Sequence, residues 1–217
     1  ASPDVVAYVR YLEVIAGKSA NTAFSYYCDL RGFSRFMKRR RGLVPADCEL
    51  KDIDPKGLDA AFWASVTKED IYEYLYFLGS ECGNKKSSTA RRLASLHGFY
   101  DYLVNQVNKL EADPTAAIHP PKQDKVLPKY LTAEQSMDLL ESTQFQSDFP
   151  ERDYCMVVLF LNCGMRLAEL VGMDLEDIDL ENRQIRLFGK GHKERMVYLN
   201  DACMEALQLY LNKRNTM

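Results

Sequence analysis

The sequence predicts a mainly α-helical protein, with a bundle of four helices followed by an α+β unit that contains a small antiparallel sheet. Before residue 110, apolar residues recur at helical spacing in four segments. Between residues 110 and 131 there are four prolines and almost no apolar periodicity, which excludes a helix there. Alternation with a period of two appears at 184–188 and 195–199, around a glycine-bearing loop, and is typical of a β-hairpin.

The first part of the chain has a start or stop signal for each of its helices. Ser19 and Asn21 are candidate caps for the second helix, and Thr67 with Asp70 three residues on is a variant of the capping box for the third. The polar stretch 43–66 predicts mostly irregular chain with one short helix near 58–63. The four helices are therefore expected at 3–16, from Ser19 or Asn21 to 41, at 67–78, and from Ser87, Ser88 or Thr89 to about 103.

The second part of the chain is expected to be mixed. Thr132 with Gln135 predicts a helix through about residue 141, and Asn200 or Asp201 caps a last helix that ends near residue 214. Between them we expect helices at 151–164 and 166–172, a short turn at 175–178, and the two hairpin strands. The expected organisation is a helical domain at 1–112, a linker at 113–130 with consecutive prolines, and a second domain at 131–217.

Length and composition describe an ordinary globular chain. It has 217 residues, 47% hydrophobic and 27% charged, and no apolar run approaches the ~18 residues that span a bilayer. The first residues show no signal peptide, so we expect a cytoplasmic protein without membrane contact. Six cysteines without a Cys-x-x-Cys pair, and three histidines, predict no metal site and no disulfide framework, but buried, reduced thiols.

The net charge of −3 argues against a nucleic-acid partner until the chain is divided. Residues 1–125 carry a net charge of +2 and residues 126–217 a net charge of −5. Bases cluster at 38–41, at Lys85 and Lys86, and at Arg91 and Arg92. The run 38–41 ends a helix, where cations offset the dipole, so we favour a solvated surface there.

Two residues of the second part are candidates for anion chemistry. Lys190 lies between two glycines at the hairpin loop, where it could reach an anion or donate a proton, although a solvated loop tip is the plainer interpretation. Arg166 begins a helix, where a cation is unfavourable unless it binds an anion. That anion is either a phosphate or the carboxylate of Glu169, three residues on.

These residues carry a resemblance to a known family. Three segments resemble the catalytic domain of the tyrosine recombinases, or phage integrases: residues 164–172 (GMRLAELVG), 177–180 (DIDL) and 189–195 (GKGHKER). They follow the order of the family, and Arg166 and Lys190 are separated by 24 positions. Residues 19–30 and 87–96 resemble the core-binding helices of the same family. The similarity covers nearly the whole chain and is greatest to Xer-type site-specific recombinases.

The resemblance implies a four-helix, SAM-like core-binding bundle and part of a catalytic domain. In such enzymes a tyrosine attacks the scissile phosphate and forms a 3′-phosphotyrosyl link, without a cofactor or metal. By resemblance Arg166 stabilises the phosphate, Glu169 supports it and Lys190 is the general acid. The implied partners are double-stranded DNA at a specific site and other protomers in a tetramer. The DNA-binding candidates are Lys18, Asn21, Thr22, Lys85, Lys86, Ser88, Thr89, Arg91 and Arg92.

One part of the family pattern is not found. In the family, the His-x-x-Arg box and the nucleophilic tyrosine follow the lysine by roughly 60–110 residues. Residues 192–195 also read His-x-x-Arg, but they lie inside the hairpin motif, so we interpret this match as a coincidence. We therefore expect a recombinase fragment that binds DNA without cleaving it. The alternatives are a naturally short, non-catalytic DNA-binding relative and a helical protein-interaction module.

Overall fold

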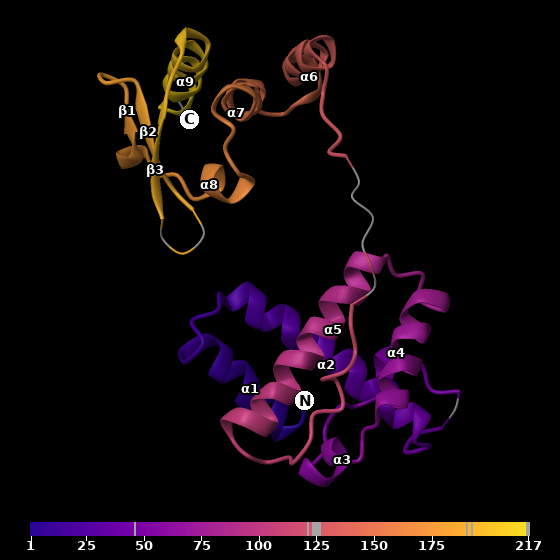
Figure 1. Ribbon diagram of the computed structural model, residues 1–217. Helices are drawn as coiled ribbons and strands as arrows, with labels where there is room; N and C mark the ends of the chain where they lie inside the picture. Colours follow the sequence, from indigo (N-terminus) through magenta and orange to yellow (C-terminus); the bar gives the residue numbers. More distant parts are fainter. Residues whose placement is uncertain (46, 121, 123–126, 190, 192, 216–217) are drawn as a thin grey trace. The chain divides into compact units, whose positions relative to one another are not determined.

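The computed structural model describes the chain except residues 46, 121, 123–126, 190, 192 and 216–217. The chain divides into two compact units, unit 1 at Ala1–Val126 and unit 2 at Leu127–Met217. Unit 1 is helical, whereas unit 2 combines helices with a small sheet (Figure 1). The predicted fold class, a helical bundle followed by an α+β unit, is confirmed.

The helices of unit 1 begin where side-chain caps satisfy free N–H groups. Ser19 accepts a hydrogen bond from the backbone of Thr22, and Thr67 and Asp70 form the reciprocal capping box that the sequence predicts. The elements are α1 (Pro3–Val14), α2 (Ala20–Arg40), η1 (Leu50–Asp52), α3 (Ala60–Ala64), α4 (Lys68–Ser80), α5 (Lys86–Asp101) and the π-helical turn η2 (Tyr102–Gln106).

The start of α5 differs from the sequence prediction. The helix begins at Lys86, with Lys85 at its N-cap and no side-chain cap, so the expected caps Ser87, Ser88 and Thr89 lie inside its first turn. The physical reason is the length of the apolar stripe, because Thr89 and Ala90 are already buried and require helical backbone before them.

The core of unit 1 is aromatic and surrounds Trp63 and Phe99. Both side chains are fully buried, and their rings meet edge to face with centroids 5.0 Å apart. Helix α2 contacts α1, α4 and α5, so its apolar face, with Leu30, Phe33 and Met37, forms the centre of the bundle.

The first residues of the expected linker belong to unit 1. Thr115 is fully buried and Ile118 is 2% exposed. The Thr115 hydroxyl lies 2.8 Å from Nδ1 of His97 and 2.6 Å from Oδ1 of Asp113, and Nε2 of His97 lies 3.1 Å from the Ile118 carbonyl oxygen. The segment 113–118 is therefore fastened to α5, and the division between the units comes after it.

Unit 2 contains a three-stranded antiparallel sheet in the order β1-β2-β3, with β1 (Ile178–Asp179), β2 (Gln184–Phe188) and β3 (Glu194–Tyr198). Strands β2 and β3 form the predicted hairpin, in which Leu187 pairs with Arg195. The two-residue strand β1 is too short to show a period and was not predicted, whereas the turn predicted at 175–178 corresponds to η3. The other elements are α6 (Ala133–Gln146), α7 (Pro150–Cys163), α8 (Leu167–Val171), η3 (Leu175–Asp177) and α9 (Asp201–Arg214).

Helices α7 and α9 lie beside the sheet and form the core of unit 2 with it (Figure 1). The apolar positions of the hairpin, Ile185, Leu187 and Val197, are buried against α7 and α9 as the alternation predicts. Gly164 ends α7 in the left-handed conformation, with φ 57°, so the chain turns sharply into Arg166. In the described chain, no helix is both long enough and apolar enough to cross a bilayer.

Candidate phosphate site and nucleic-acid interface

Arg166 occupies the N-cap of α8, directly after the turn at Gly164. Its side chain is 73% exposed, and its Nη1 donates a hydrogen bond of 2.6 Å to Oε1 of Glu169. The Arg166 backbone N–H donates to Oε2 of the same carboxylate at 2.8 Å. Nη2 and Nε of Arg166 make no hydrogen bond within the described part of the chain, so one edge of the guanidinium can bind an external anion.

Glu169 is a buried acid rather than one partner of a surface ion pair. Its side chain is 1% exposed and lies between the guanidinium groups of Arg166 and Arg195. The hydrogen bond from Arg195, together with the N–H groups of Arg166, outweighs burial and lowers the pKa of Glu169 to about 2. Of the two anions that the sequence left open for Arg166, the structure shows the Glu169 carboxylate, and Arg166 still exposes donors to solvent.

The low pKa of Glu169 predicts an acid-sensitive unit 2. The folded-state pKa is lower than the unfolded one, so this group stabilises the fold fully above about pH 5 and loses its contribution as the pH falls toward 2. Urea unfolding of the wild type and Glu169→Gln should therefore give a difference in unfolding free energy that is larger at pH 7 than at pH 3. An equal difference at both pH values would contradict the assignment.

Gly189 brings the base of the hairpin loop to this ion pair. A Cβ atom added at Gly189 would lie 3.3 Å from Oε1 of Glu169 and 3.8 Å from Nη1 of Arg166. The Gly189 N–H donates to the Lys193 carbonyl at 2.8 Å and closes the loop. Lys190, the predicted general acid, lies outside the described residues, but its chain neighbour Gly189 contacts the Arg166–Glu169 pair.

Arg195 is the member of this cluster that sequence reasoning missed. Its Nη2 donates to Oε2 of Glu169 at 2.8 Å and to the Gly164 carbonyl at 3.1 Å. Its position in the strand could have indicated a buried partner. Val197 and Leu199 face the core, so period two places Arg195 on the same face of the strand, where a cation needs a partner. The interpretation of His-x-x-Arg as part of the hairpin agrees with the location of Arg195 in β3.

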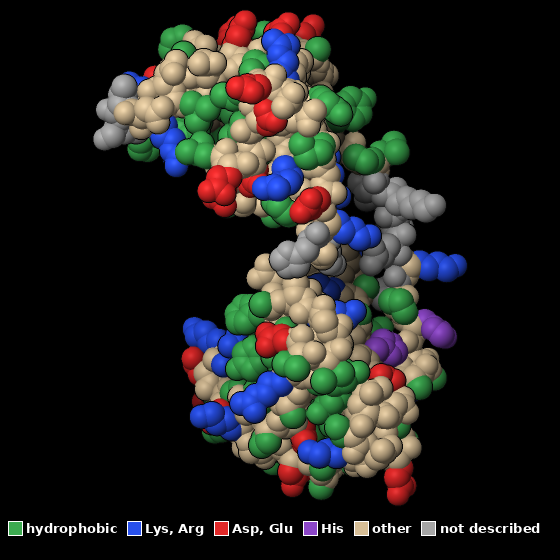
Figure 2. Space-filling model, turned by 90° about the vertical axis from the view of Figure 1, so that its left-hand side faces the viewer, with side chains coloured by type: hydrophobic (Ala, Val, Ile, Leu, Met, Phe, Trp, Pro, Cys, Tyr) green, Lys and Arg blue, Asp and Glu red, His purple; other side chains and the backbone are tan. Residues whose placement is uncertain are grey.

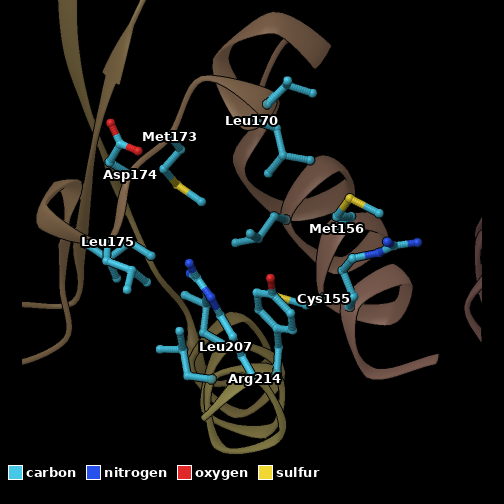
Figure 3. A pocket seen from close by; sticks show the side chains of 14 residues that line it. Cys155, Met156, Leu170, Met173, Asp174, Leu175, Leu207 and Arg214 are labelled. Carbon is cyan, nitrogen blue, oxygen red and sulfur yellow. The ribbon is translucent and has the colours of Figure 1, made fainter. Parts of the chain in front are cut away.

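A separate apolar cavity of about 170 Å³ lies between α7, the segment from α8 to η3, and α9. Figure 3 shows Met156, Leu170, Met173, Leu175 and Leu207 around it. Neither Arg166, Glu169 nor Arg195 lines this cavity. It is therefore distinct from the arginine site.

The start of α5 presents some of the predicted DNA-binding residues and buries another. Lys85 and Lys86 are exposed and Ser88 is partly exposed, whereas Thr89 is 8% exposed and faces the core. The helix has no side-chain cap and no acidic residue in its first turn. Its N-terminus thus combines lysines with N–H groups that no side chain caps, a combination that favours an anion.

Arg91 and Arg92 both lie beside the buried carboxylate of Asp29. Arg91 forms an ion pair with Oδ2 of Asp29, and Nε of Arg92 lies 3.8 Å from Oδ1 of the same carboxylate. Ser95 donates a hydrogen bond of 2.7 Å to Asp29, whose side chain is 5% exposed. Arg91 remains 47% exposed and Arg92 30% exposed, so both combine a structural contact with solvent access.

The candidates at the start of α2 lie at the other end of this helix pair. Asp29 contacts Arg91 and Ser95, whereas Tyr26 lies near Gly98, so α2 and α5 run antiparallel. Lys18 and Asn21 are exposed, and the hydroxyl of Thr22 lies 2.9 Å from that of Ser19 in the helix cap. The two groups of candidates are thus separated by about 20 Å along α5.

The basic run 38–41 is partly exposed and also makes contacts within unit 1. Lys38 donates to the Asp54 carbonyl, Arg39 lies over the ring of Phe77, and Arg40 and Arg41 both bind Asp70. Arg40 and Arg41 are exposed, as the solvated surface expected from the sequence requires, but the side chains of the run also connect the end of α2 to the following segments. On the face of unit 1 in Figure 2, Lys and Arg side chains are scattered among hydrophobic, neutral and acidic ones.

All six cysteines are free thiols, and only Cys155 and Cys203 are buried, so the expectation of buried thiols holds for two of six. Sγ of Cys163 lies 3.9 Å from Sγ of Cys203, and burial raises the pKa of Cys163 to about 12. Among the described residues, no group of three or more His, Cys, Asp or Glu side chains could hold a metal ion.

The sequence of the chain is similar to those of known proteins. The profile of the phage integrase family matches residues 129–217. The chain is 39% identical over 212 residues to tyrosine recombinase XerC of Caldanaerobacter subterraneus subsp. tengcongensis, a match that covers 98% of this chain and 59% of the relative. Tyrosine recombinase XerC of Myxococcus xanthus is 34% identical, and the match covers 100% of this chain and 65% of that protein.

The fold also matches solved structures. A lambda integrase tetramer bound to a Holliday junction aligns with a TM-score of 0.67 and 17% identity, over 99% of this chain and 56% of that one. The chain belongs to the phage integrase family, the tyrosine recombinases. It is similar to Xer-type members and spans about three fifths of the length of the curated relatives it matches.

Proposed function

We propose that this chain is part of a site-specific DNA recombinase, an enzyme that cleaves and rejoins DNA strands through a 3′-phosphotyrosyl intermediate. The observation that carries the proposal is Arg166: a buried carboxylate holds one edge of its guanidinium, and the other edge is exposed to solvent. A preorganised, half-paired arginine is suited to bind the non-bridging oxygens of a phosphodiester as negative charge develops on them.

Two further roles follow for the same site. Lys190 would donate its proton to the 5′-oxygen that leaves when a tyrosine attacks phosphorus, and Gly189 keeps the base of its loop beside Arg166. Glu169 supports Arg166 and is itself too buried to contact DNA. The chemistry needs no cofactor, because the phosphotyrosyl link conserves the phosphodiester bond energy.

The helical unit would provide most of the DNA affinity through phosphate contacts. The proposed contacts come from both ends of the α2–α5 pair. The two ends are farther apart than the width of a major groove, ~12 Å, so the contacts would fall on phosphates on either side of a groove. Thr89 is left out of this set because it is buried. The residues proposed are Lys18, Asn21, Thr22, Lys85, Lys86, Ser88, Arg91 and Arg92.

The partners proposed are double-stranded DNA at a specific site and other recombinase protomers in a tetramer. The compartment proposed is the cytoplasm. The second arginine box and the nucleophilic tyrosine of the family are not identified in these 217 residues. We therefore propose that this chain by itself binds DNA without cleaving it.

Salt dependence of DNA binding tests this function. With a labelled 30-base-pair duplex drawn from a random-sequence pool, log Kd should rise linearly with log salt concentration, because each phosphate contact releases counterions. Lys85→Gln should reduce the slope by about one. Lys56→Gln removes the same charge from the segment before α3 and should leave the slope unchanged. A salt-independent or undetectable interaction would instead favour a helical protein-interaction module.

A further inference from the structure

Arg195 stands at an unusual place for a cation, on the core-facing side of β3. Its neighbours on that side, Val197 and Leu199, are 8% and 4% exposed, and its cross-strand partner Leu187 is 1% exposed. The side chain is 40% exposed, its Nη2 is hydrogen-bonded, and its Nε is buried without a partner among the described residues. Both acceptors that it uses belong to the turn and helix that present Arg166.

The hydrogen bonds of Glu169 are divided between the two arginines. Oε2 accepts from Nη2 of Arg195 and from the backbone N–H of Arg166, each at 2.8 Å, whereas Oε1 accepts from Nη1 of Arg166 at 2.6 Å. Arg195 therefore fixes the carboxylate from the side opposite the exposed guanidinium. Without it, the carboxylate could rotate and the Arg166 side chain, 73% exposed, would lose its fixed direction.

Arg195 also connects this carboxylate to the hairpin. It belongs to the strand that follows the loop, and Gly189, at the other end of the loop, packs against the same carboxylate. Its bond to the Gly164 carbonyl joins β3 to the turn before α8. The three contacts hold the base of the Lys190 loop and the start of α8 in one arrangement.

We propose that Arg195 is a positioning residue for phosphate recognition: it fixes Glu169, and through Glu169 it directs the guanidinium of Arg166 and sets the base of the Lys190 loop beside it. This rests on the proposed function, in which Arg166 binds a DNA phosphate. Arg195 acts in this proposal through Glu169: its side chain is 40% exposed, but both hydrogen bonds of its Nη2 are made inside the protein, and its Nε is buried.

A double-mutant cycle on this chain tests the proposal with a duplex selected from a random 30-base-pair pool. Arg166→Ala and Arg195→Gln should each weaken binding, Arg195→Gln by roughly three- to tenfold. In the Arg166→Ala background, Arg195→Gln should have no further effect on Kd or on the salt slope. Equal losses in both backgrounds would overturn the proposal, since they would mean a direct DNA contact or a general structural defect.

Two further measurements separate positioning from loss of structure. Carbon-13 NMR titration should show the pKa of Glu169 rising in Arg195→Gln, while the circular dichroism spectrum stays that of the wild type; an unchanged pKa would contradict the contact. If Arg195→Gln fails to fold, Arg195→Lys, which keeps the charge but cannot reach both acceptors as a fork, replaces it in the cycle. If the wild-type chain binds no duplex, the proposed function fails; if Arg166→Ala weakens binding but the cycle shows no coupling, only the positioning role fails.

Discussion

Replacing Trp63 by alanine is expected to destabilise unit 1 by about 3–5 kcal/mol, which is a large share of the stability of a domain of this size. Trp63 is fully buried, and its ring meets Phe62 and Phe99 edge to face, with centroids 5.4 and 5.0 Å away. The backbone carbonyl of Trp63 accepts a hydrogen bond of 3.3 Å from Tyr100. Truncation therefore opens a cavity at the point where α3 packs on α5.

The measurement is urea unfolding followed by far-ultraviolet circular dichroism, because Trp63 is the only tryptophan and its removal abolishes the fluorescence signal. Trp63→Phe is the matched control. The indole N–H is buried without a hydrogen-bond partner within the described residues, so phenylalanine removes an unsatisfied donor along with part of the ring. Trp63→Phe should therefore lower the free energy of unfolding clearly less than Trp63→Ala does. A loss below about 1 kcal/mol for Trp63→Ala would contradict the packing described.

Replacing Asp29 by alanine is expected to lower the stability of unit 1 and raise its affinity for DNA. The carboxylate accepts from Ser95 and pairs with Arg91, and Arg92 lies near it, so its removal leaves cations without their acid. The free energy of unfolding should fall by about 2–4 kcal/mol, a loss limited because the half-exposed Arg91 can turn toward water. The freed positive charge should tighten binding to duplex DNA roughly two- to fivefold.

Unfolding and DNA titrations on the same samples check both effects. Glu81→Gln is the control, because it removes one negative charge at an exposed position after α4 and should alter stability by less than about 0.5 kcal/mol. Weaker DNA binding by a folded Asp29→Ala protein would show that Asp29 orients Arg91 and Arg92 for their contacts rather than competing for them.

Local signals were sufficient for most of the secondary structure. Ser19, the Thr67–Asp70 box, the Thr132–Gln135 box and Asn200 cap the helices that the sequence assigns to them. These motifs work because a cap and the N–H groups it satisfies lie within one turn of each other. The prediction was wrong where no local cap exists, at the start of α5, and missed β1, whose formation depends on its pairing with β2.

Side-chain partners were predictable only at short range. The Arg166–Glu169 pair, three residues apart, was one of two alternatives left open by the sequence. The pairing of Arg195 with Glu169, of Arg91 with Asp29 and of Arg41 with Asp70 joins residues 26 to 62 positions apart, and no periodic pattern encodes such distances. For the same reason, the contacts of the basic run 38–41 with Asp54, Phe77 and Asp70 were not predicted.

By itself, the sequence determined the fold class, the spacing of Arg166 and Lys190, and the resemblance to tyrosine recombinases, because these depend on residue type and position along the chain. The tertiary structure alone decided which carboxylate each base pairs with. Arg166 keeps one free edge, whereas Arg40 and Arg41 share a nearly buried acid. The physical reason is that a cation is neutralised by whichever carboxylate the fold brings beside it, and that proximity is a property of packing rather than of sequence neighbourhood.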